Sequence, residues 1–174
     1  MRIFPLLFSG LLIVLAPLSA WAEQSTTNGT VSLSVATACR IASVSSLSFG
    51  NYDSIGTNAT QALDSTGSIG VVCTNGTSTA RVSLSQGSNP AAGSSCVNPL
   101  RRMRNSQGGW LSYAIYRDAA KQQPWGCVPE NSYLLPAFGR VLTPINISPY
   151  GSVPPGQLVG VGDYVDTIEV VVTF

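Results

Sequence analysis

The segment from Tyr164 to Phe174 reads Tyr-Val-Asp-Thr-Ile-Glu-Val-Val-Val-Thr-Phe, and it is the strongest β-strand signal in the chain. Side chains alternate between the two faces of a strand. One face of this segment therefore carries Ile168, Val170, Val172 and Phe174. Only Asp166 and Glu169 interrupt the apolar run, although proteins usually protect a strand edge with charge, proline or a covering loop. We expect an apolar edge strand here that needs a partner.

The same alternation recurs through the rest of the chain, and Gly, Asn, Pro and Ser separate the runs. The expected strands or extended segments cover residues 29–38, 47–49, 69–73, 82–84, 110–116, 138–147 and 164–174. Residues 88–99 and 149–162 are expected to be loops, and residues 117–121 are expected to form a single helical turn. Seven or eight short strands with regular turn signals predict one all-β domain, an antiparallel sandwich of immunoglobulin-like architecture.

The composition excludes several classes of function. The chain has 174 residues, no histidine and 10% charged residues, with a formal charge of +1. Without histidine there is no Ser-His-Asp or Cys-His arrangement and no histidine metal ligand. Nearly balanced charge argues against nucleic acid as a partner. We therefore expect a protein that is not an enzyme and that holds neither metal nor cofactor.

Residues 1–22 have the features of a signal peptide. Met1-Arg2 provides the positive start, an apolar run follows from Leu6 to Leu18, and Ala20-Trp21-Ala22 resembles a cleavage site. A transmembrane anchor is the alternative, but the apolar run is short for a bilayer core of about 30 Å. We expect cleavage after Ala22 and export of the remaining chain.

The four cysteines are expected to form two disulfides. They are Cys39, Cys73, Cys96 and Cys127. An even number in an exported chain indicates disulfides, whereas a zinc site would need CxxC spacing or histidine. Three pairings are possible, and we favour the sequential one, Cys39–Cys73 and Cys96–Cys127.

The segment that precedes the first cysteine allows two hypotheses. Val31, Leu33 and Val35 alternate with small polar or small apolar residues, behind a mostly polar start at residues 23–28. This strand could pair with the last one and close the sandwich within one molecule. It could instead add to the sheet edge of a second copy and produce head-to-tail polymers.

In several short motifs the chain resembles the spore coat protein U domain family, which includes the subunits of archaic chaperone–usher pili. The resemblance rests on the order of several short motifs along the exported chain. They are the alternating segment before Cys39, Leu47-Ser48-Phe49-Gly50-Asn51-Tyr52, Gly70-Val71-Val72-Cys73, Arg101-Arg102-Met103, Leu111-Ser112-Tyr113, Tyr116-Arg117-Asp118-Ala119-Ala120, Pro124-Trp125-Gly126, Phe138-Gly139-Arg140 and Gly162-Asp163-Tyr164-Val165-Asp166-Thr167.

The resemblance implies an immunoglobulin-like sandwich that lacks its last strand. A periplasmic chaperone, and then the donor strand of a neighbouring subunit, would complete the sandwich, and an outer-membrane usher would take part in assembly. In this chain the resemblance assigns residues 1–22 to the leader, 23–38 to the donor strand and 39–174 to the sandwich domain. Val31, Leu33 and Val35 would be the donor anchors. The acceptor groove would be lined by Leu47, Phe49, Ile168, Val170, Val172 and Phe174.

These observations together predict a structural subunit of a surface pilus that serves adhesion or biofilm formation. One alternative is a secreted coat or matrix protein whose sandwich closes on itself. Another is a carbohydrate-binding module, in which Trp110, Trp125 and Tyr150 would stack on sugars, although aromatic residues on strands usually pack in the core.

Two charged clusters have simpler explanations. Arg101, Arg102 and Arg104 are expected to lie on a solvated strand and to pair with carboxylates, rather than to bind nucleic acid or polysaccharide. Asp163, Asp166 and Glu169 could suggest a glycosidase pair, but residues three apart on a strand point to opposite faces.

Overall fold

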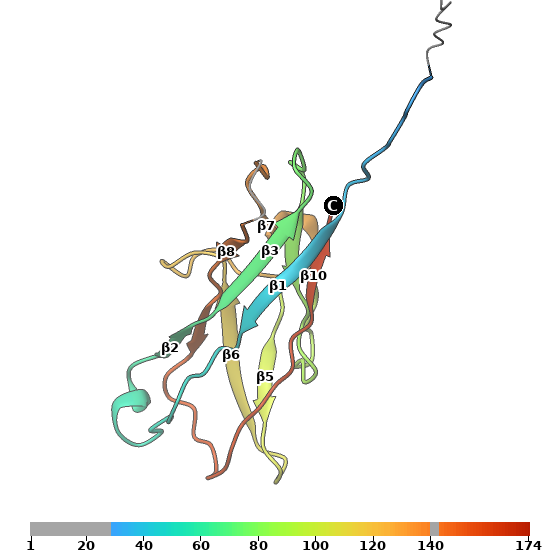
Figure 1. Ribbon diagram of the computed structural model, residues 1–174. Coiled ribbons are helices and arrows are strands. Elements are labelled where there is room, and N and C mark those ends of the chain that lie inside the picture. Colours follow the sequence, from blue (N-terminus) through green and yellow to red (C-terminus); the bar gives the residue numbers. More distant parts are fainter. Residues whose placement is uncertain (1–28, 140–142) are drawn as a thin grey trace, which may run out of the picture. The chain divides into compact units, whose positions relative to one another are not determined.

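The computed structural model describes residues 29–139 and 143–174 (Figure 1). It divides into two units, residues 1–34 and 35–174, and each is considered by itself. The predicted signal peptide lies outside the described residues. Residues 29–34 of the first unit have no regular secondary structure, and every named element belongs to the second unit. No helix in the described parts of the chain is long and apolar enough to span a membrane.

The second unit consists of short antiparallel strands, which confirms the predicted all-β fold. The strands are β1 (Cys39–Ser45), β2 (Leu63–Thr66), β3 (Ser68–Cys73), β4 (Arg81–Leu84), β5 (Arg101–Arg104), β6 (Trp110–Tyr116), β7 (Tyr133–Leu134), β8 (Ile145–Ile147), β9 (Tyr150–Val153) and β10 (Val170–Thr173). Two 3₁₀ helices, η1 (Thr57–Ala59) and η2 (Pro129–Asn131), lie between them. The hydrogen-bonded groups are β1-β3-β8, β10-β4-β7 and β2-β9-β6-β5.

The core fills the space between these strand groups, and alternation explains which residues it takes. On β6 the side chains of Leu111, Tyr113 and Ile115 are buried, as the sequence predicts. Val82 and Leu84 of β4 are buried in the same way. The rest of the core comes from residues of the other strands and their loops, namely Ile69, Val71, Cys73, Ala80, Met103, Trp125, Leu135, Phe138, Ile147 and Val153.

Two expected loops or turns are wrong. Residues 150–153 form β9, which lies between β2 and β6, although residues 149–162 are expected to be a loop. The sequence of this strand shows no apolar alternation, because Gly151, which faces the interior together with Val153, has no side chain. Residues 117–121 form a bend and a turn rather than a helical turn, since the Asp118 carboxylate accepts the backbone N–H groups of Gln122 and Gln123.

The strands at the two ends of the domain also differ from the predicted ones. The first strand of the sandwich covers residues 39–45, because it pairs with β3, while residues 47–49 follow it without regular structure. Only residues 170–173 of the final segment form a ladder, with β4. Val165 instead forms an isolated bridge with Arg104 of β5, whereas the carbonyl oxygens of Thr167 and Glu169 accept the backbone N–H groups of Ser88 and Ser85. Residues 164–169 therefore cross from β5 to the segment after β4 without forming one regular ladder.

Arg101 does not lie on a solvated face and has no carboxylate partner in the described residues. Its side chain is buried, with 1% exposure, and donates hydrogen bonds to the carbonyl oxygens of Leu84, Ser85 and Trp125 at 2.6–3.2 Å. Burial lowers the pKa of the guanidinium to about 10, which leaves it charged at neutral pH. Arg101 therefore ties β5 to the end of β4 and to the segment around Trp125.

Two disulfides brace the domain in the sequential pairing. Cys39–Cys73 joins the ends of the paired strands β1 and β3, and Cys96–Cys127 joins the 86–100 loop to the segment before η2. In the chain-entropy model a loop of this size contributes about 3.5–4 kcal/mol of stability.

Replacing Arg101 by Met is expected to destabilise the domain strongly, because the carbonyl oxygens of Leu84, Ser85 and Trp125 lose this donor, and the first and last of these bonds are buried. We expect the free energy of unfolding, measured by urea titration, to fall by about 3 kcal/mol. R40M, at an exposed arginine of β1, is the control and should cost less than about 0.5 kcal/mol. Equal losses for the two variants would show that the hydrogen bonds of Arg101 do not stabilise the fold.

Candidate functional site

Two edge strands from different strand groups, β1 and β10, lie next to each other without pairing. Among the described residues β1 pairs only with β3, and β10 pairs only with β4. Figure 1 shows β1 and β10 as neighbours, and no hydrogen-bonded ladder joins them. An unpaired edge presents free N–H and C=O groups that can bind another extended segment.

A groove with an apolar floor lies between the segments that border these two strands. Its first part has a volume of about 270 Å³, with residues 44–49 on one side and residues 164–170 on the other. The floor consists of core side chains that the strands turn inward, namely Ile69, Leu84, Met103, Tyr113 and Ile115. Core residues are therefore reachable from the groove.

A second part of the groove, of about 760 Å³, continues along the same two segments. It lies between residues 46–54 and 159–165. The two parts share Ser46, Leu47, Phe49, Met103, Tyr164 and Val165. Because these residues border both volumes, we treat the two parts as one elongated groove, called here the β1/β10 groove.

Phe49 is held in the wall of the groove by its contacts with two strands. Its ring meets the ring of Tyr113 edge to face, with centroids 6.1 Å apart. A Cβ atom at Gly151 would lie only 2.7 Å from Phe49 Cζ, so the ring packs directly on the backbone of β9. Gly151 thus allows Phe49 to lie this close to the sheet.

The Asp166 carboxylate holds the opposite wall. It accepts hydrogen bonds from the Ser88 backbone N–H, the Asn89 side-chain amide and the Tyr113 hydroxyl, at 2.7–3.0 Å. Burial, and then this hydrogen bond to Asp166, raises the pKa of Tyr113 well above its usual range, so its hydroxyl stays protonated as a donor. Asp166 therefore anchors the crossing segment 164–169 to β6 and to the loop after β4.

The structure brings most of the expected acceptor residues together at this groove. Leu47, Phe49, Ile168 and Val170 line it. Val172 is half-buried and packs against the core beyond the lining, whereas Phe174 is 53% exposed. The lining residues that sequence reasoning did not assign to the site are mainly Val44, Met103, Tyr113 and Tyr164. The alternating pattern of β6 could have indicated that Tyr113 points into the core. It could not have indicated that this part of the core is reachable from a groove.

The expected donor residues carry exposed apolar side chains. Val31 and Leu33 are 98% and 90% exposed, and Val35, the first residue of the second unit, is also exposed. Residues 29–38 form no strand. The segment therefore has the alternating apolar and polar residues of a β-strand, but it forms no ladder with another strand in the described residues.

The chemistry of the groove is that of a binding surface. Apolar side chains dominate the lining of its first part, where the Asp166 carboxylate is already occupied by three donors. Asp163, which borders the second part, is exposed to solvent. The described residues contain no group of three potential metal ligands. A groove with an apolar floor, bordered by two strand edges, is suited to hold an extended peptide by main-chain hydrogen bonds and alternate side chains.

Comparison with known proteins places this fold in a family. The model of the Spore Coat Protein U domain matches residues 25–171. A relative named Protein U, from Myxococcus xanthus, is 40% identical over 161 residues, which cover 89% of this chain and 88% of that protein.

Solved structures give related folds. This chain is similar to a chain in the complex of CsuC with CsuE, a chaperone–tip adhesion subunit pre-assembly complex from archaic chaperone–usher Csu pili of Acinetobacter baumannii. The TM-score is 0.54 and the identity 25%, over 80% of this chain but only 40% of the matched one. A weaker likeness, with a TM-score of 0.40 and 18% identity, is to HdaB, the E. coli Hda pilus minor tip subunit, over 76% of this chain and 79% of that one. The predicted immunoglobulin-like sandwich agrees with the first of these structures.

Replacing Asp166 by Ala is expected to loosen the wall of the groove. Three hydrogen bonds are lost and the buried Tyr113 hydroxyl is left without its acceptor, so we expect the free energy of unfolding to fall by about 2–3 kcal/mol. Backbone amides of residues 164–169 should also exchange faster in hydrogen-exchange measurements.

D163A provides the matched control, because Asp163 is an exposed carboxylate directly before this segment. We expect it to change stability by less than about 0.5 kcal/mol and to leave exchange unaltered. If D166A behaves like D163A in both measurements, Asp166 does not anchor this wall.

Proposed function

The chain belongs to the Spore Coat Protein U domain family, and we propose that it is a structural subunit of a surface pilus built by donor-strand exchange. In this proposal the β1/β10 groove of one copy receives residues 29–38 of the next. The resulting fibre serves adhesion or biofilm formation and has no catalytic role. The observation that carries the proposal is the apolar groove between two strands with unpaired edges.

The free energy gained by burying apolar surface supports the acceptor role of the groove. Ile168 and Val170 are half-buried against the core, and β10, which begins at Val170, forms a ladder with β4 on one side only. An inserted strand would cover these side chains and the floor beneath them, and about 25 cal/mol is gained for each Å² of apolar surface removed from water. Its backbone would also pair with the open edges of β1 and β10.

The sequence before β1 supports the donor role. Val31, Leu33 and Val35 fall on one face of an extended segment, and the residues between them are the small Ser32 and Ser34. The three apolar side chains would enter the groove, while the two serines would face solvent. Since Cys39 begins β1 and is fixed to Cys73, the donor segment is tethered directly to the body of its own subunit.

The uncovered β1/β10 groove indicates which partners the subunit needs. A subunit with an uncovered apolar groove is prone to aggregation before assembly. A periplasmic chaperone would cover the groove, an outer-membrane usher would secrete the subunit, and neighbouring subunits would replace the chaperone. The similarity to a pilus subunit that was solved in a complex with its chaperone supports this route through the periplasm to the cell surface.

Deleting residues 23–36 from the exported chain is expected to abolish polymerisation and to leave a subunit that accepts the missing strand in trans. Adding a synthetic peptide of residues 27–38 should raise the midpoint of thermal unfolding of the deleted protein. Light scattering and calorimetry give the two readouts. If the deleted protein is as stable as the full chain and equally polymeric, donor-strand exchange is excluded.

The alternation itself provides a matched control for the peptide. A peptide with Leu33→Glu should fail to stabilise the deleted protein, because a charge would be buried in the groove. A peptide with Ser34→Glu carries the same added charge at the neighbouring residue. Because that residue lies on the opposite face of the strand, this peptide should still bind. A full chain that remains a stable monomer, with residues 29–38 protected from hydrogen exchange, would instead indicate a sandwich that closes on itself.

On the acceptor side, Ile168→Glu is expected to weaken peptide binding by at least tenfold, because the new carboxylate would lie in the apolar lining. Thr167→Glu is the control, since Thr167 is exposed on the opposite face of the same segment. Isothermal titration with the 27–38 peptide measures both affinities. Equal affinities would place the peptide outside the β1/β10 groove.

A further inference from the structure

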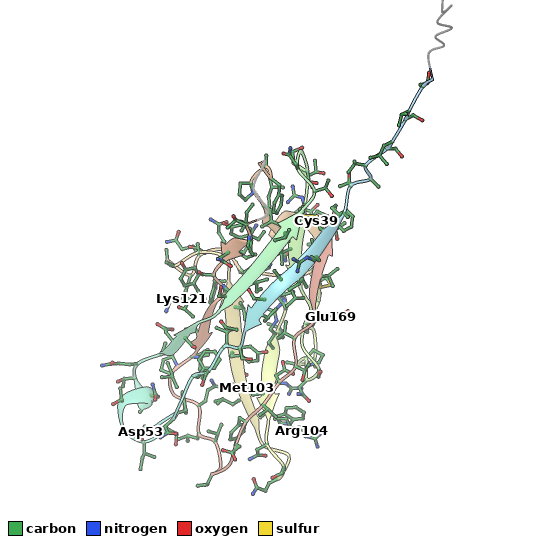
Figure 2. The ribbon with its side chains drawn as sticks, viewed as in Figure 1. Cys39, Asp53, Met103, Arg104, Lys121 and Glu169 are labelled. Carbon is green, nitrogen blue, oxygen red and sulfur yellow. A yellow bond between two sulfur atoms is a disulfide. The ribbon has the colours of Figure 1, made fainter. Side chains whose placement is uncertain are left out.

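The outer face of the β2-β9-β6-β5 sheet carries a cluster of arginine and tryptophan that the groove does not use. Arg102 and Arg104 lie two residues apart on β5, and Trp110 lies opposite Arg104 on β6. The intervening residue, Met103, points inward to the groove, whereas Arg104 is exposed (Figure 2). A ligand on this outer face would therefore not compete with a strand in the groove.

The guanidinium groups of both arginines contact the same indole ring. The Cζ atoms of Arg102 and Arg104 lie 4.2 Å and 5.0 Å from the centroid of Trp110. This distance is typical of cation–π contacts, which hold a guanidinium flat and leave its N–H groups at the edge able to donate. Trp110 remains 39% exposed, so part of the ring is still open to a ligand.

These cations have no anionic partner in the described part of the chain. There the one salt bridge joins Lys121 to Asp64, at the far edge of the same sheet. Arg102 donates instead to the carbonyl oxygens of Asn89 and Pro90, at 3.4 and 2.9 Å, which orients it without neutralising it. Two oriented positive charges therefore face solvent beside an aromatic ring.

We propose that Arg102, Arg104 and Trp110 form a binding site for an acidic polysaccharide. Side chains two residues apart on a strand are about 7 Å apart, so a polymer with a carboxylate on each sugar can meet both arginines at once. The exposed part of the indole offers an apolar surface to the C–H groups of a sugar ring. Across the sheet from Arg102, the exposed Ser112 adds a hydroxyl group to the same face.

The charge of the chain favours a polysaccharide over nucleic acid. Nucleic-acid binding relies on many phosphate contacts along a basic surface. This chain has a formal charge of only +1, and Asp64 lies on the same outer face as the two arginines. Two arginines match the sparse carboxylates of a uronic acid polymer better than the dense phosphates of DNA.

The test measures binding of the exported chain to immobilised polygalacturonate by surface plasmon resonance, with neutral dextran as the comparison polymer. We expect binding to polygalacturonate that weakens with salt, and none to dextran. R104A should reduce the affinity at least fivefold. The double variant R102K/R104K, which keeps the charge but loses the planar guanidinium groups, should also reduce it.

R40A removes the same charge from an exposed position on β1 and should keep the affinity within twofold of the unchanged chain. Circular dichroism checks that each variant is folded. The proposal is overturned if the chain does not bind polygalacturonate, if R104A and R40A have equal effects, or if a single-stranded DNA oligonucleotide binds more tightly than polygalacturonate. Polymerisation is measured separately, and its loss in the deletion experiment would not alter any of these outcomes.

Discussion

A β-strand in a folded domain is stabilised by burial of its apolar face and by hydrogen bonds along its edges. In the described residues, β1 and β10 each have hydrogen bonds along one edge only. Each pairs with one neighbour, β3 or β4, and leaves its other edge open. Between them core side chains such as Met103 and Ile115 are reachable from the surface.

Buried polar groups support the β1/β10 groove together with the packing of Phe49 on Tyr113 and Gly151. Arg101 satisfies three carbonyl oxygens where β4, β5 and the segment around Trp125 meet. Asp166 collects three donors and sets the path of the crossing segment. Such groups bind in one geometry, because an unpaired buried donor or acceptor is costly.

The strands with strong apolar alternation could be predicted from sequence, and those without it could not. β6 and β4 follow the expected pattern, with every second side chain buried. β9 has Gly151 where an inward side chain would stand, so its pattern resembles a loop. The final segment reads as one long strand, yet only residues 170–173 form a regular ladder with β4, and Val165 pairs with β5 instead. Local alternation contains no information about which strand a residue pairs with.

The sequence by itself determined the all-β class and the apolar stripe at Ile168 and Val170, since these depend on composition and on a two-residue period. Only the tertiary structure decided that Arg101 is buried, that Asp166 anchors the wall of the groove, and that Trp110 lies beneath two guanidinium groups. The physical reason is that these contacts join residues far apart along the chain, or on adjacent strands, whose pairing is set by the register of the sheets.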